Sequence, residues 1–346
     1  MKAIVKYEEG DGFVDLREVE EPEPGPGEVK IEVHAAGICG SDLHILHGDI
    51  GIPMRVPVVL GHEYSGVIVK CGEGVNGWAE GECVTAENSR TVCGRCEYCM
   101  TGHYNLCSER LATGYAFDGA FTTYCVSPQE RLHALPETVD FHTGALSDPS
   151  ACAYRATVEM AQVQPGDTVL ITGPGPMGLF CSQYATMSGA RVIITGTAAD
   201  KERLALAKSL GAALQTDADS SAALAEIEEF TEGKGVDVVL ECAGSPAAAR
   251  LGLKAVKKRG RLVQVGLFGK PFEIDLDQLV LKELSVMGSF SQKYLAWERA
   301  IELAGRGKVQ ASPLITDILP LSEWKEGFHR FESRKAIKVV FEPQRG

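Results

Sequence analysis

Four cysteines lie close together in the stretch CGRCEYCMTGHYNLC, at Cys93, Cys96, Cys99 and Cys107. Two residues separate the first from the second and the second from the third, and seven separate the third from the fourth. Four thiolates at this spacing can close a tetrahedron around one zinc ion and leave no open position for a substrate. The spacing therefore predicts a structural zinc site. The alternatives are an iron–sulfur cluster, which also uses four thiolates, and four unrelated buried cysteines.

Three other segments carry metal-ligand chemistry. They are GICGSDLH, with Cys39, Ser41, Asp42 and His44, then GHEYSG, with His62 and Glu63, and GALSDPSACAY, with Asp148 and Cys152. A thiolate, an imidazole and a carboxylate suit a catalytic zinc, which keeps three protein ligands and one open position. In the last segment an acid and a thiol stand four residues apart, and either can bind a metal.

A glycine-rich turn predicts a dinucleotide site. The stretch VLITGPGPMGLF places Gly173, Gly175 and Gly178 directly after a β-branched run and directly before a helical one, with Pro176 and Met177 between them. The glycines permit a tight turn and let backbone N–H groups approach a pyrophosphate at the helix N-terminus.

The choice between NAD and NADP stays open. The second strand ends at Thr197 without the acidic residue that usually binds the ribose 2′-hydroxyl. The first acid, Asp200, comes late and stands beside Lys201 and Arg203, so a 2′-phosphate is admissible, while Asp200 can still reach a ribose. We expect Thr197, Lys201 and Arg203 at the cofactor, together with Val265 and Gly266 after a later strand.

The elements that must position these residues fall into two groups. Roughly the first 135 residues, with VKIEVHAAGI and SGVIVKCG, predict an irregular β domain. From Pro165 strands and helices alternate, which predicts a doubly wound parallel sheet, and GRLVQVGL is interpreted as an edge of that sheet. YLAWERAIELAGRGKV predicts an amphipathic helix ending at Gly305 or Gly307. No helix pattern follows the last strand, AIKVVF, so we expect the chain to return to the first domain.

Composition narrows the function classes. A chain of 346 residues suits two domains, and a net charge of −13 without a basic cluster argues against a nucleic-acid partner. No apolar run approaches about 18 residues, and the start MKAIVKYEEGDG lacks a signal-peptide pattern, so we expect no membrane partner and a cytoplasmic location. Eleven cysteines in such a chain are expected to be reduced and partly metal-binding.

The motifs GxCGSDxH, GHExxG, the four-cysteine lobe and GPGPMG, in this order and separation, resemble the zinc-dependent medium-chain alcohol dehydrogenases, and among them the polyol branch that is similar to sorbitol dehydrogenase. The resemblance spans essentially the whole chain. It implies a GroES-like irregular β catalytic domain over residues 1–149, completed by residues 291–346. It also implies an inserted Rossmann NAD(P)-binding domain over residues 150–290.

The resemblance further implies two zinc ions per chain and a set of site residues. Cys39 and His62 would hold the catalytic zinc, with Glu63 at or beside the fourth position, and Ser41 and His44 would form the proton path. Asp148, followed by proline, matches the third-ligand position, where polyol relatives carry Glu. Its side chain is one methylene shorter, so it would bind zinc directly or through a water, and in the second case Glu63 takes the ligand position.

The implied reaction is reversible hydride transfer between NAD(P) and a secondary hydroxyl of a polyol, sugar or sugar derivative. Candidate pocket residues are His47, Tyr115, Phe117, Phe290 and Ser291. In the stretch GSFSQKY, Ser291 and Gln292 replace an Arg-Tyr pair of polyol relatives. Two alternatives are a threonine dehydrogenase-like oxidation of an amino alcohol and a non-catalytic nucleotide-binding role. Family resemblance suggests a homotetramer or homodimer.

Overall fold

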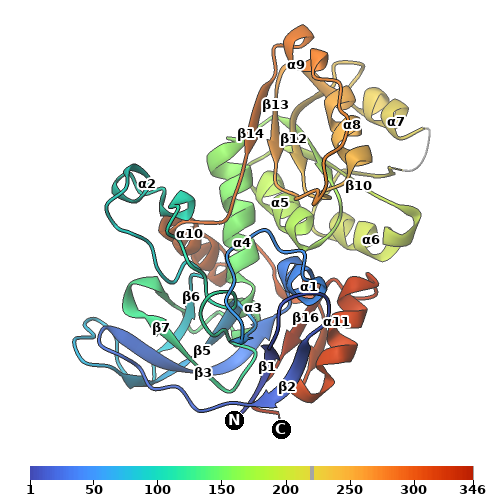
Figure 1. Cartoon of the computed structure of the whole chain (residues 1–346). Helices are drawn as coiled ribbons and strands as arrows, with labels where there is room; N and C mark the ends of the chain where they lie inside the picture. Colours follow the sequence, from blue (N-terminus) through green and yellow to red (C-terminus); the bar gives the residue numbers. More distant parts are fainter. Residues whose placement is uncertain (219–221, 346) are drawn as a thin grey trace. The chain divides into compact units, whose positions relative to one another are not determined.

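The computed structural model describes residues 1–218 and 222–345 and divides the chain into two compact units (Figure 1). Unit 1 comprises Met1–Asp148 and Gln292–Gly346, and unit 2 comprises Pro149–Ser291. Unit 2 is therefore an insertion in unit 1, and its bounds differ by one residue from those expected from the sequence. No helix in the described part of the chain has the length and apolar character needed to cross a membrane.

Unit 1 is built on a seven-stranded sheet with the order β15-β16-β3-β5-β6-β8 and with β7 paired to β3. The strands are β3 (Glu28–Gly37), β5 (Glu63–Cys71), β6 (Cys83–Ala86), β7 (Tyr124–Pro128), β8 (Leu132–Ala134), β15 (Ile315–Leu319) and β16 (Lys338–Phe341). The last strand, β16, lies between β15 and β3, so the C-terminal segment completes the sheet of unit 1, as the AIKVVF run predicts.

A smaller sheet and several short helices complete unit 1. The sheet has the order β2-β1-β4, with β1 (Lys2–Lys6), β2 (Val14–Glu18) and β4 (Val58–Val59). The helices are α1 (Gly40–His47), α2 (Glu97–Met100), η1 (Tyr104–Leu106), η2 (Gln129–Arg131), α3 (Phe141–Ala145), α10 (Tyr294–Gly305), η5 (Ser312–Leu314), η6 (Leu321–Glu323) and α11 (Trp324–Glu332). Side chains from both sheets and from α11, including Ile4, Phe121, Phe328 and Phe341, form one apolar core. The predicted irregular β domain is confirmed.

Helix α10 shows how the sequence pattern sets the packing of unit 1. Its buried residues are Ala296, Trp297, Ala300 and Ile301, which lie on one face at the spacing of an amphipathic helix. The Trp297 ring stacks on the ring of His133 from β8, with centroids 5.2 Å apart and planes 3° from parallel. The helix ends at Gly305, one of the two predicted positions.

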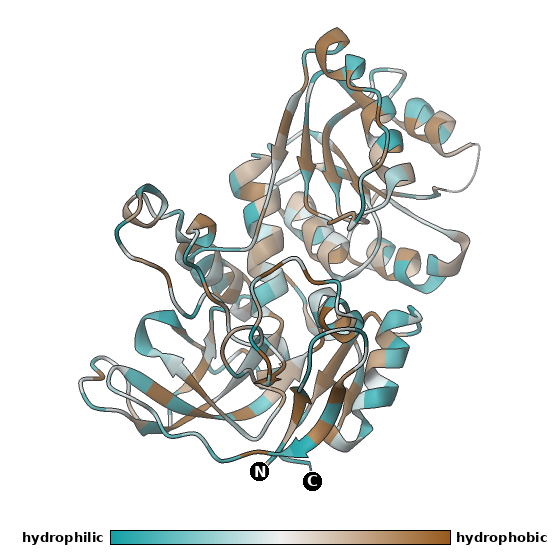
Figure 2. Cartoon of the chain, in the orientation of Figure 1, coloured by the Kyte–Doolittle hydropathy of each residue, from teal (hydrophilic) through white to brown (hydrophobic). Residues whose placement is uncertain are grey.

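Unit 2 is a doubly wound sheet in which all strand pairs are parallel. The six strands have the order β11-β10-β9-β12-β13-β14 and are β9 (Thr168–Thr172), β10 (Arg191–Gly196), β11 (Leu214–Asp217), β12 (Val236–Glu241), β13 (Val256–Gln264) and β14 (Ser285–Gly288). The helices are α5 (Pro176–Met187), η4 (Ala198–Asp200), α6 (Lys201–Ser209), α7 (Ala223–Phe230), α8 (Pro246–Ala255) and α9 (Asp277–Leu281). Helix α4 (Ser147–Tyr154) contains the boundary between the units and continues as the π-helix η3 (Arg155–Met160). The central strands are strongly apolar, as in parallel sheets covered on both faces (Figure 2). The predicted fold class is confirmed.

One expectation about this sheet is wrong. The GRLVQVGL run was expected to form a sheet edge, but β13, which holds most of it, lies between β12 and β14. The edge is instead the short strand β14, of sequence SVMG. A later, weakly patterned strand adds to the sheet, so β13 has a neighbouring strand on each side.

Candidate active site and metal centres

The four cysteines of the lobe come together in unit 1. The sulfur atoms of Cys93, Cys96, Cys99 and Cys107 all lie within 4.8 Å of one another. The backbone N–H groups of Arg95 and Cys96 lower the pKa of the Cys93 thiol to about 6, whereas burial raises that of Cys99 to about 12. Backbone N–H groups stabilise the thiolate form of Cys93, and the three other sulfur atoms lie close enough to bind the same ion. This arrangement fits a closed zinc site.

A second cluster joins Cys39, His62 and Glu63, whose ligand atoms also lie within 4.8 Å of one another. The pairing of β3 with β5 explains why residues distant in sequence meet. Gly37, at the end of β3, is the register partner of Glu63, at the start of β5. A Cβ atom on Gly37 would lie 2.7 Å from a carboxylate oxygen of Glu63, so a larger residue here would displace that carboxylate. Thiolate, imidazole and carboxylate on neighbouring chain segments fit a catalytic zinc.

Asp42 supports this cluster from α1. Its Oδ2 atom accepts a hydrogen bond of 2.8 Å from the backbone N–H of Cys39, and its Oδ1 atom lies 3.7 Å from Nδ1 of His62. Burial lowers the pKa of His62, but the charges of Asp42 and Cys39 outweigh it and raise that pKa to about 10. Asp42 therefore both fixes the start of α1 and faces the imidazole as an orienting carboxylate.

Lys338 is a functional residue that the motifs do not predict. Its Nζ atom donates to the Glu63 carboxylate and, at 2.6 Å, to the backbone carbonyl of Ile38. Glu63 and Lys338 are each 1 % exposed, so each charge depends on the other for compensation. The available signal was a lysine that opens the otherwise apolar strand KVVF.

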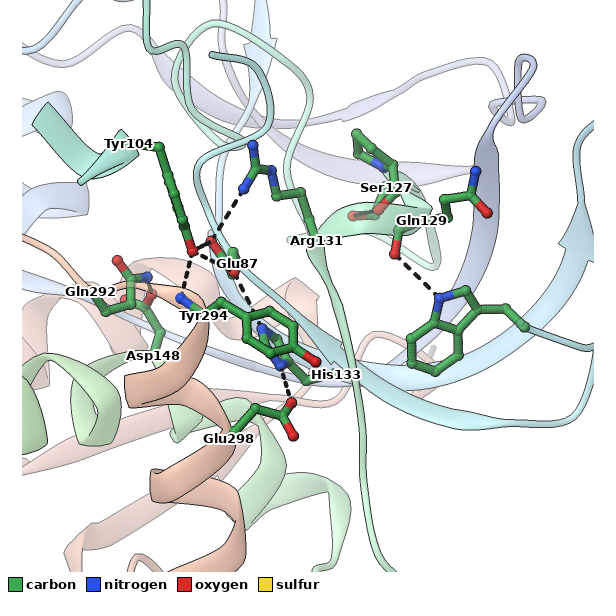
Figure 3. Close-up of polar contacts among 12 residues, drawn as sticks. Glu87, Tyr104, Ser127, Gln129, Arg131, His133, Asp148, Gln292, Tyr294 and Glu298 are labelled. Carbon is green, nitrogen blue, oxygen red and sulfur yellow. Dashed lines mark hydrogen bonds and ion pairs between the residues drawn. The ribbon is translucent and has the colours of Figure 1, made fainter. Parts of the chain in front are cut away.

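Asp148 lies in unit 1 but is not part of the group of described residues within 4.8 Å of one another. It is the second residue of α4, and its Oδ1 atom accepts a hydrogen bond from the buried amide of Gln292 (Figure 3). Burial raises the pKa of Asp148 to about 7. Its role as a metal ligand stays a prediction. Cys152, the competing thiol, belongs to unit 2.

The two predicted members of the proton path lie one turn apart on α1. The hydroxyl of Tyr115 donates to Ser41 Oγ at 2.7 Å, and Ser41 Oγ lies 3.5 Å from Nε2 of His62. His44 is half exposed and its Nδ1 atom lies 2.9 Å from Asp49. Burial and the charges of Cys39 and Asp42 raise the pKa of Tyr115 well above its usual value, so Tyr115 stays a donor to Ser41.

The other predicted pocket residues lie in both units of the chain. His47 contacts Asp11 at 3.2 Å and Glu332 at 2.6 Å. Phe117 lies beside Arg90, with 4.8 Å from the guanidinium to the ring centroid, and lines a cavity of about 330 Å³ near the N-terminus. Phe290 and Ser291 belong to unit 2. Pocket roles for these four residues stay predictions.

The glycine turn lies between β9 and α5, as predicted. Gly173 has φ +88°, in the left-handed region that favours glycine. A Cβ atom on Gly178 would lie 1.9 Å from the carbonyl oxygen of Gly173, whereas one on Gly175 would meet no atom within 4 Å. Pro176 starts α5 directly after Gly175, and Met177 follows it. The turn is thus packed at Gly178 and open at Gly175, which fits a pyrophosphate approaching the helix N-terminus.

The ends of β10 and β12 carry the other cofactor candidates. Asp200 is buried, its Oδ2 atom accepts from the backbone N–H and the hydroxyl of Thr197, and its Oδ1 atom lies 3.7 Å from Arg203. Lys201 is exposed at the start of α6. Glu241, a buried acid that the motifs do not predict, ends β12 and accepts from Thr172 and from the backbone N–H groups of Ala243 and Gly244.

Val265 and Gly266 follow β13, and their backbone N–H groups both donate to the carbonyl oxygen of Glu241, at 2.9 and 2.8 Å. Glu241, at the carboxyl end of β12, therefore holds the loop that follows β12 and the loop that follows β13. In this type of fold a dinucleotide binds at the carboxyl ends of the strands.

The comparisons with known proteins agree with this architecture. Residues 25–137 match the alcohol dehydrogenase GroES-like domain, and residues 176–306 match the zinc-binding dehydrogenase domain. The chain is 43 % identical to a sorbitol dehydrogenase of Halalkalibacterium halodurans, over 99 % of both chains. It is 37 % identical to a D-arabitol-phosphate dehydrogenase of Enterococcus avium, over 99 % of this chain and 97 % of the other. A solved zinc-binding dehydrogenase of Sinorhizobium meliloti bound to NADP is 32 % identical, with a TM-score of 0.89 over 99 % of both chains.

The fold, the two ligand clusters and the dinucleotide turn define a zinc-dependent, NAD(P)-dependent oxidoreductase that acts on alcohols. The chain belongs to the zinc-dependent medium-chain alcohol dehydrogenase family and, within it, to the polyol branch.

Two alanine substitutions in the glycine turn separate folding from cofactor binding. We expect Gly178→Ala to lower the free energy of unfolding by about 1–3 kcal/mol, because its methyl group clashes with the backbone. Gly175→Ala should leave unfolding unchanged and weaken NAD(P)H binding about tenfold, since its methyl group occupies the open side of the turn. Denaturant unfolding measures the free energy of unfolding, and fluorescence titration with NADH and NADPH measures cofactor affinity. Equal effects of the two variants on unfolding would contradict this division of roles.

The pH dependence of zinc binding follows from His62. In the metal-free protein its pKa of about 10 keeps it protonated at neutral pH, and zinc requires the neutral imidazole. The zinc association constant should therefore rise with pH up to about pH 10, by about tenfold per unit for one released proton. Calorimetric titration in buffers of different ionisation enthalpy counts the protons released, and Cys39→Ser provides the baseline from the four-cysteine site. Affinity independent of pH at the Cys39 site would refute the expectation.

Proposed function

We propose that the protein reversibly oxidises a secondary hydroxyl of a polyol or sugar derivative with NAD(P)⁺, at the cluster of Cys39, His62 and Glu63. The observation that carries the proposal is the hydroxyl pair Tyr115–Ser41 directly beside this cluster. A binding protein without catalysis has no use for a metal-ligand cluster with an adjacent proton acceptor.

The protein's own groups prepare the alcohol for hydride loss. Zinc, held by Cys39, His62 and either Glu63 or Asp148, would supply a Lewis acid that lowers the pKa of an alcohol in the site. Ser41 accepts a hydrogen bond from Tyr115 and keeps a second lone pair for the hydroxyl hydrogen of the substrate. As the proton of the alcohol passes to Ser41 Oγ, the hydroxyl proton of Ser41 leaves toward solvent by way of His44, so that Ser41 stays neutral.

His44 is the outlet of this path. It lies one helical turn beyond Ser41, is half exposed and contacts Asp49, and the two ring nitrogens of an imidazole can accept a proton on one side and donate one on the other. Direct delivery of the proton from Ser41 to water would expose the reacting carbon to solvent, so a separate outlet lets the site exclude water while the hydride moves.

The substrate class follows from the relatives and from two substituted positions. Relatives of this chain are a sorbitol dehydrogenase and a D-arabitol-phosphate dehydrogenase. Where polyol relatives carry Arg-Tyr, this chain carries Ser291 and Gln292, and Gln292 is engaged with Asp148. The cation is lost and Ser291 remains as a hydrogen-bonding candidate, which favours a neutral polyhydroxylated substrate over an anionic one.

Oxidation of an amino alcohol such as threonine is the second candidate. Its support is the Asp148-Pro149 pair at the third-ligand position and a 36 % identical L-threonine 3-dehydrogenase of Bacillus velezensis that covers 99 % of both chains.

A substrate panel tests the function. Polyols, aldoses, threonine and simple alcohols are assayed with NAD⁺ and NADP⁺ by absorbance of the reduced cofactor, and we expect polyols to give the highest kcat/KM. Ser41→Ala should lower kcat about a hundredfold or more without weakening NAD(P)H binding, because only the proton step is lost. Ser209→Ala, at the end of α6, is the control. Unchanged turnover in both Ser41→Ala and Cys39→Ser would overturn the proposal.

We also propose that the protein works as a cytoplasmic homodimer or homotetramer. None of the eleven cysteines, all of which lie in the described residues, forms a disulfide bond, which suits a reducing compartment. For assembly, the support is the edge strand β14 together with Leu276, Val280 and Leu281 on and beside α9, which are 60, 78 and 70 % exposed. Figure 2 shows the apolar character of α9.

The assembly can be tested by adding charge to this surface. We expect Val280→Glu, combined with Val286→Lys on β14, to shift the mass measured by mass photometry toward the monomer, because both positions are exposed and apolar. Leu295→Glu, an exposed position on α10, should leave the mass unchanged. A monomeric wild-type protein would refute the assembly.

A further inference from the structure

Gln292 makes a contact that neither the motifs nor the family match assigns. Its side chain is fully buried, and its amide nitrogen donates to Oδ1 of Asp148. A hydrogen bond to one carboxylate oxygen fixes the rotation of the carboxylate and leaves the other oxygen for a second partner. This matters more for Asp than for Glu, because the shorter side chain has fewer torsions with which to reach a metal.

Asp148 and Gln292 also flank the two points at which the chain passes between unit 1 and unit 2. Asp148 is the last residue of the first segment of unit 1, and Gln292 is the first residue of its second segment. The position of the Asp148 carboxylate therefore depends on how the returning chain is held just after Gln292.

Tyr104, in the four-cysteine lobe, holds that returning segment (Figure 3). It lies in η1, between Cys99 and Cys107 in sequence, and its hydroxyl accepts the backbone N–H of Tyr294 at 2.5 Å. The same hydroxyl donates to the carboxylate of Glu87, whose oxygens lie 2.9 and 2.8 Å away. The start of α10, two residues after Gln292, is thus bound to the lobe.

The first turn of α10 is fixed from a second side. His133 of β8 is buried, its Nδ1 atom lies 2.6 Å from Glu298 and its Nε2 atom lies 3.4 Å from Glu87. The Trp297 ring also stacks on His133, so α10, β8 and Glu87 are connected by contacts through His133. Tyr104 joins this network through its hydrogen bond to Glu87.

We propose that Gln292 is a positioning residue of the catalytic metal centre: it orients Asp148 for the metal, and Tyr104 of the four-cysteine lobe holds Gln292 in place through the start of α10. The inference rests on the proposed function, since it takes Cys39 and His62 as ligands of the catalytic zinc and Asp148 as the third ligand. Gln292 then contacts a metal ligand, whereas the Arg-Tyr pair at positions 291 and 292 of polyol relatives contacts the substrate.

Zinc retention tests the first part. Wild-type protein, Gln292→Leu, Gln292→Glu and Gln129→Leu are challenged with a chelator, and bound zinc is followed by native mass spectrometry. Gln292→Glu keeps the shape of the side chain but loses the N–H donor, and Gln129 is a hydrogen-bonded glutamine elsewhere in unit 1. We expect both Gln292 variants to lose one ion, the ion that Cys39→Ser lacks, about 10–100-fold faster than wild type, and Gln129→Leu to match wild type.

Cobalt substitution adds a spectroscopic reading. The visible spectrum of the cobalt protein should change in Gln292→Glu and Gln292→Asn, because the coordination at Asp148 changes, while NAD(P)H binding stays intact. These two variants keep a polar side chain of similar or smaller size, so they serve if Gln292→Leu does not fold.

A double-mutant cycle tests the connection to the lobe. Tyr104→Phe removes the hydroxyl that holds Tyr294, and Tyr98→Phe, on the exposed helix α2 of the same lobe, is its control. Tyr104→Phe should speed loss of the same ion, and it should add nothing further in the Gln292→Leu background.

The outcomes separate the two proposals. Wild-type protein that holds a single zinc ion, at the four cysteines, would defeat the proposed function itself. Two ions in the wild type with equal loss rates and cobalt spectra in the Gln292 variants would overturn the positioning role alone. Additive effects of Tyr104→Phe and Gln292→Leu would overturn the role of the lobe.

Discussion

The buried ion pair of Glu63 and Lys338 is the interaction on which the active site of this enzyme depends. Its partners are 275 positions apart in sequence and come from β5 and β16. Removing one member of such a pair leaves an uncompensated charge at a cost of about 3–5 kcal/mol. Because Lys338 also donates to the carbonyl of Ile38, directly before Cys39, the pair fixes both the carboxylate and the backbone that carries the thiolate.

The sheet of unit 1 is arranged around this pair. Strand β16 must lie beside β3 to bring Lys338 to Glu63, and β3 must pair with β5 in the register that places Gly37 opposite Glu63. Any side chain on Gly37 would meet the carboxylate. The Glu63–Lys338 pair therefore requires three things at once. The metal-ligand cluster must form, β3 and β5 must pair in this register, and the C-terminal segment must return to the sheet of unit 1.

The sequence predicted what is local. The cysteine lobe and the glycine turn are each encoded within about twenty residues, and the sequence also predicted the alternation of strands and helices in unit 2. Lys338 and Glu87 were not predicted, because each acts through a partner far along the chain and no spacing marks it. Gln292 was singled out only as a replacement in the substrate pocket, and its contact with Asp148 was not predicted for the same reason. The sheet edge was misassigned for a related reason. Whether β13 is an edge depends on β14, whose sequence SVMG has little strand pattern of its own.

The place of Lys338 in the last strand has a consequence for biosynthesis. A ribosome delivers the chain from its N-terminus, so residues 149–291 emerge as one continuous stretch that can fold at once. The metal-ligand residues emerge earlier, but the lysine that balances Glu63 emerges only after the whole of unit 2. Glu63 can therefore be buried with its partner only after unit 2 and the returning segment have been made, and stable metal loading of the active site follows that step in the maturation of the enzyme.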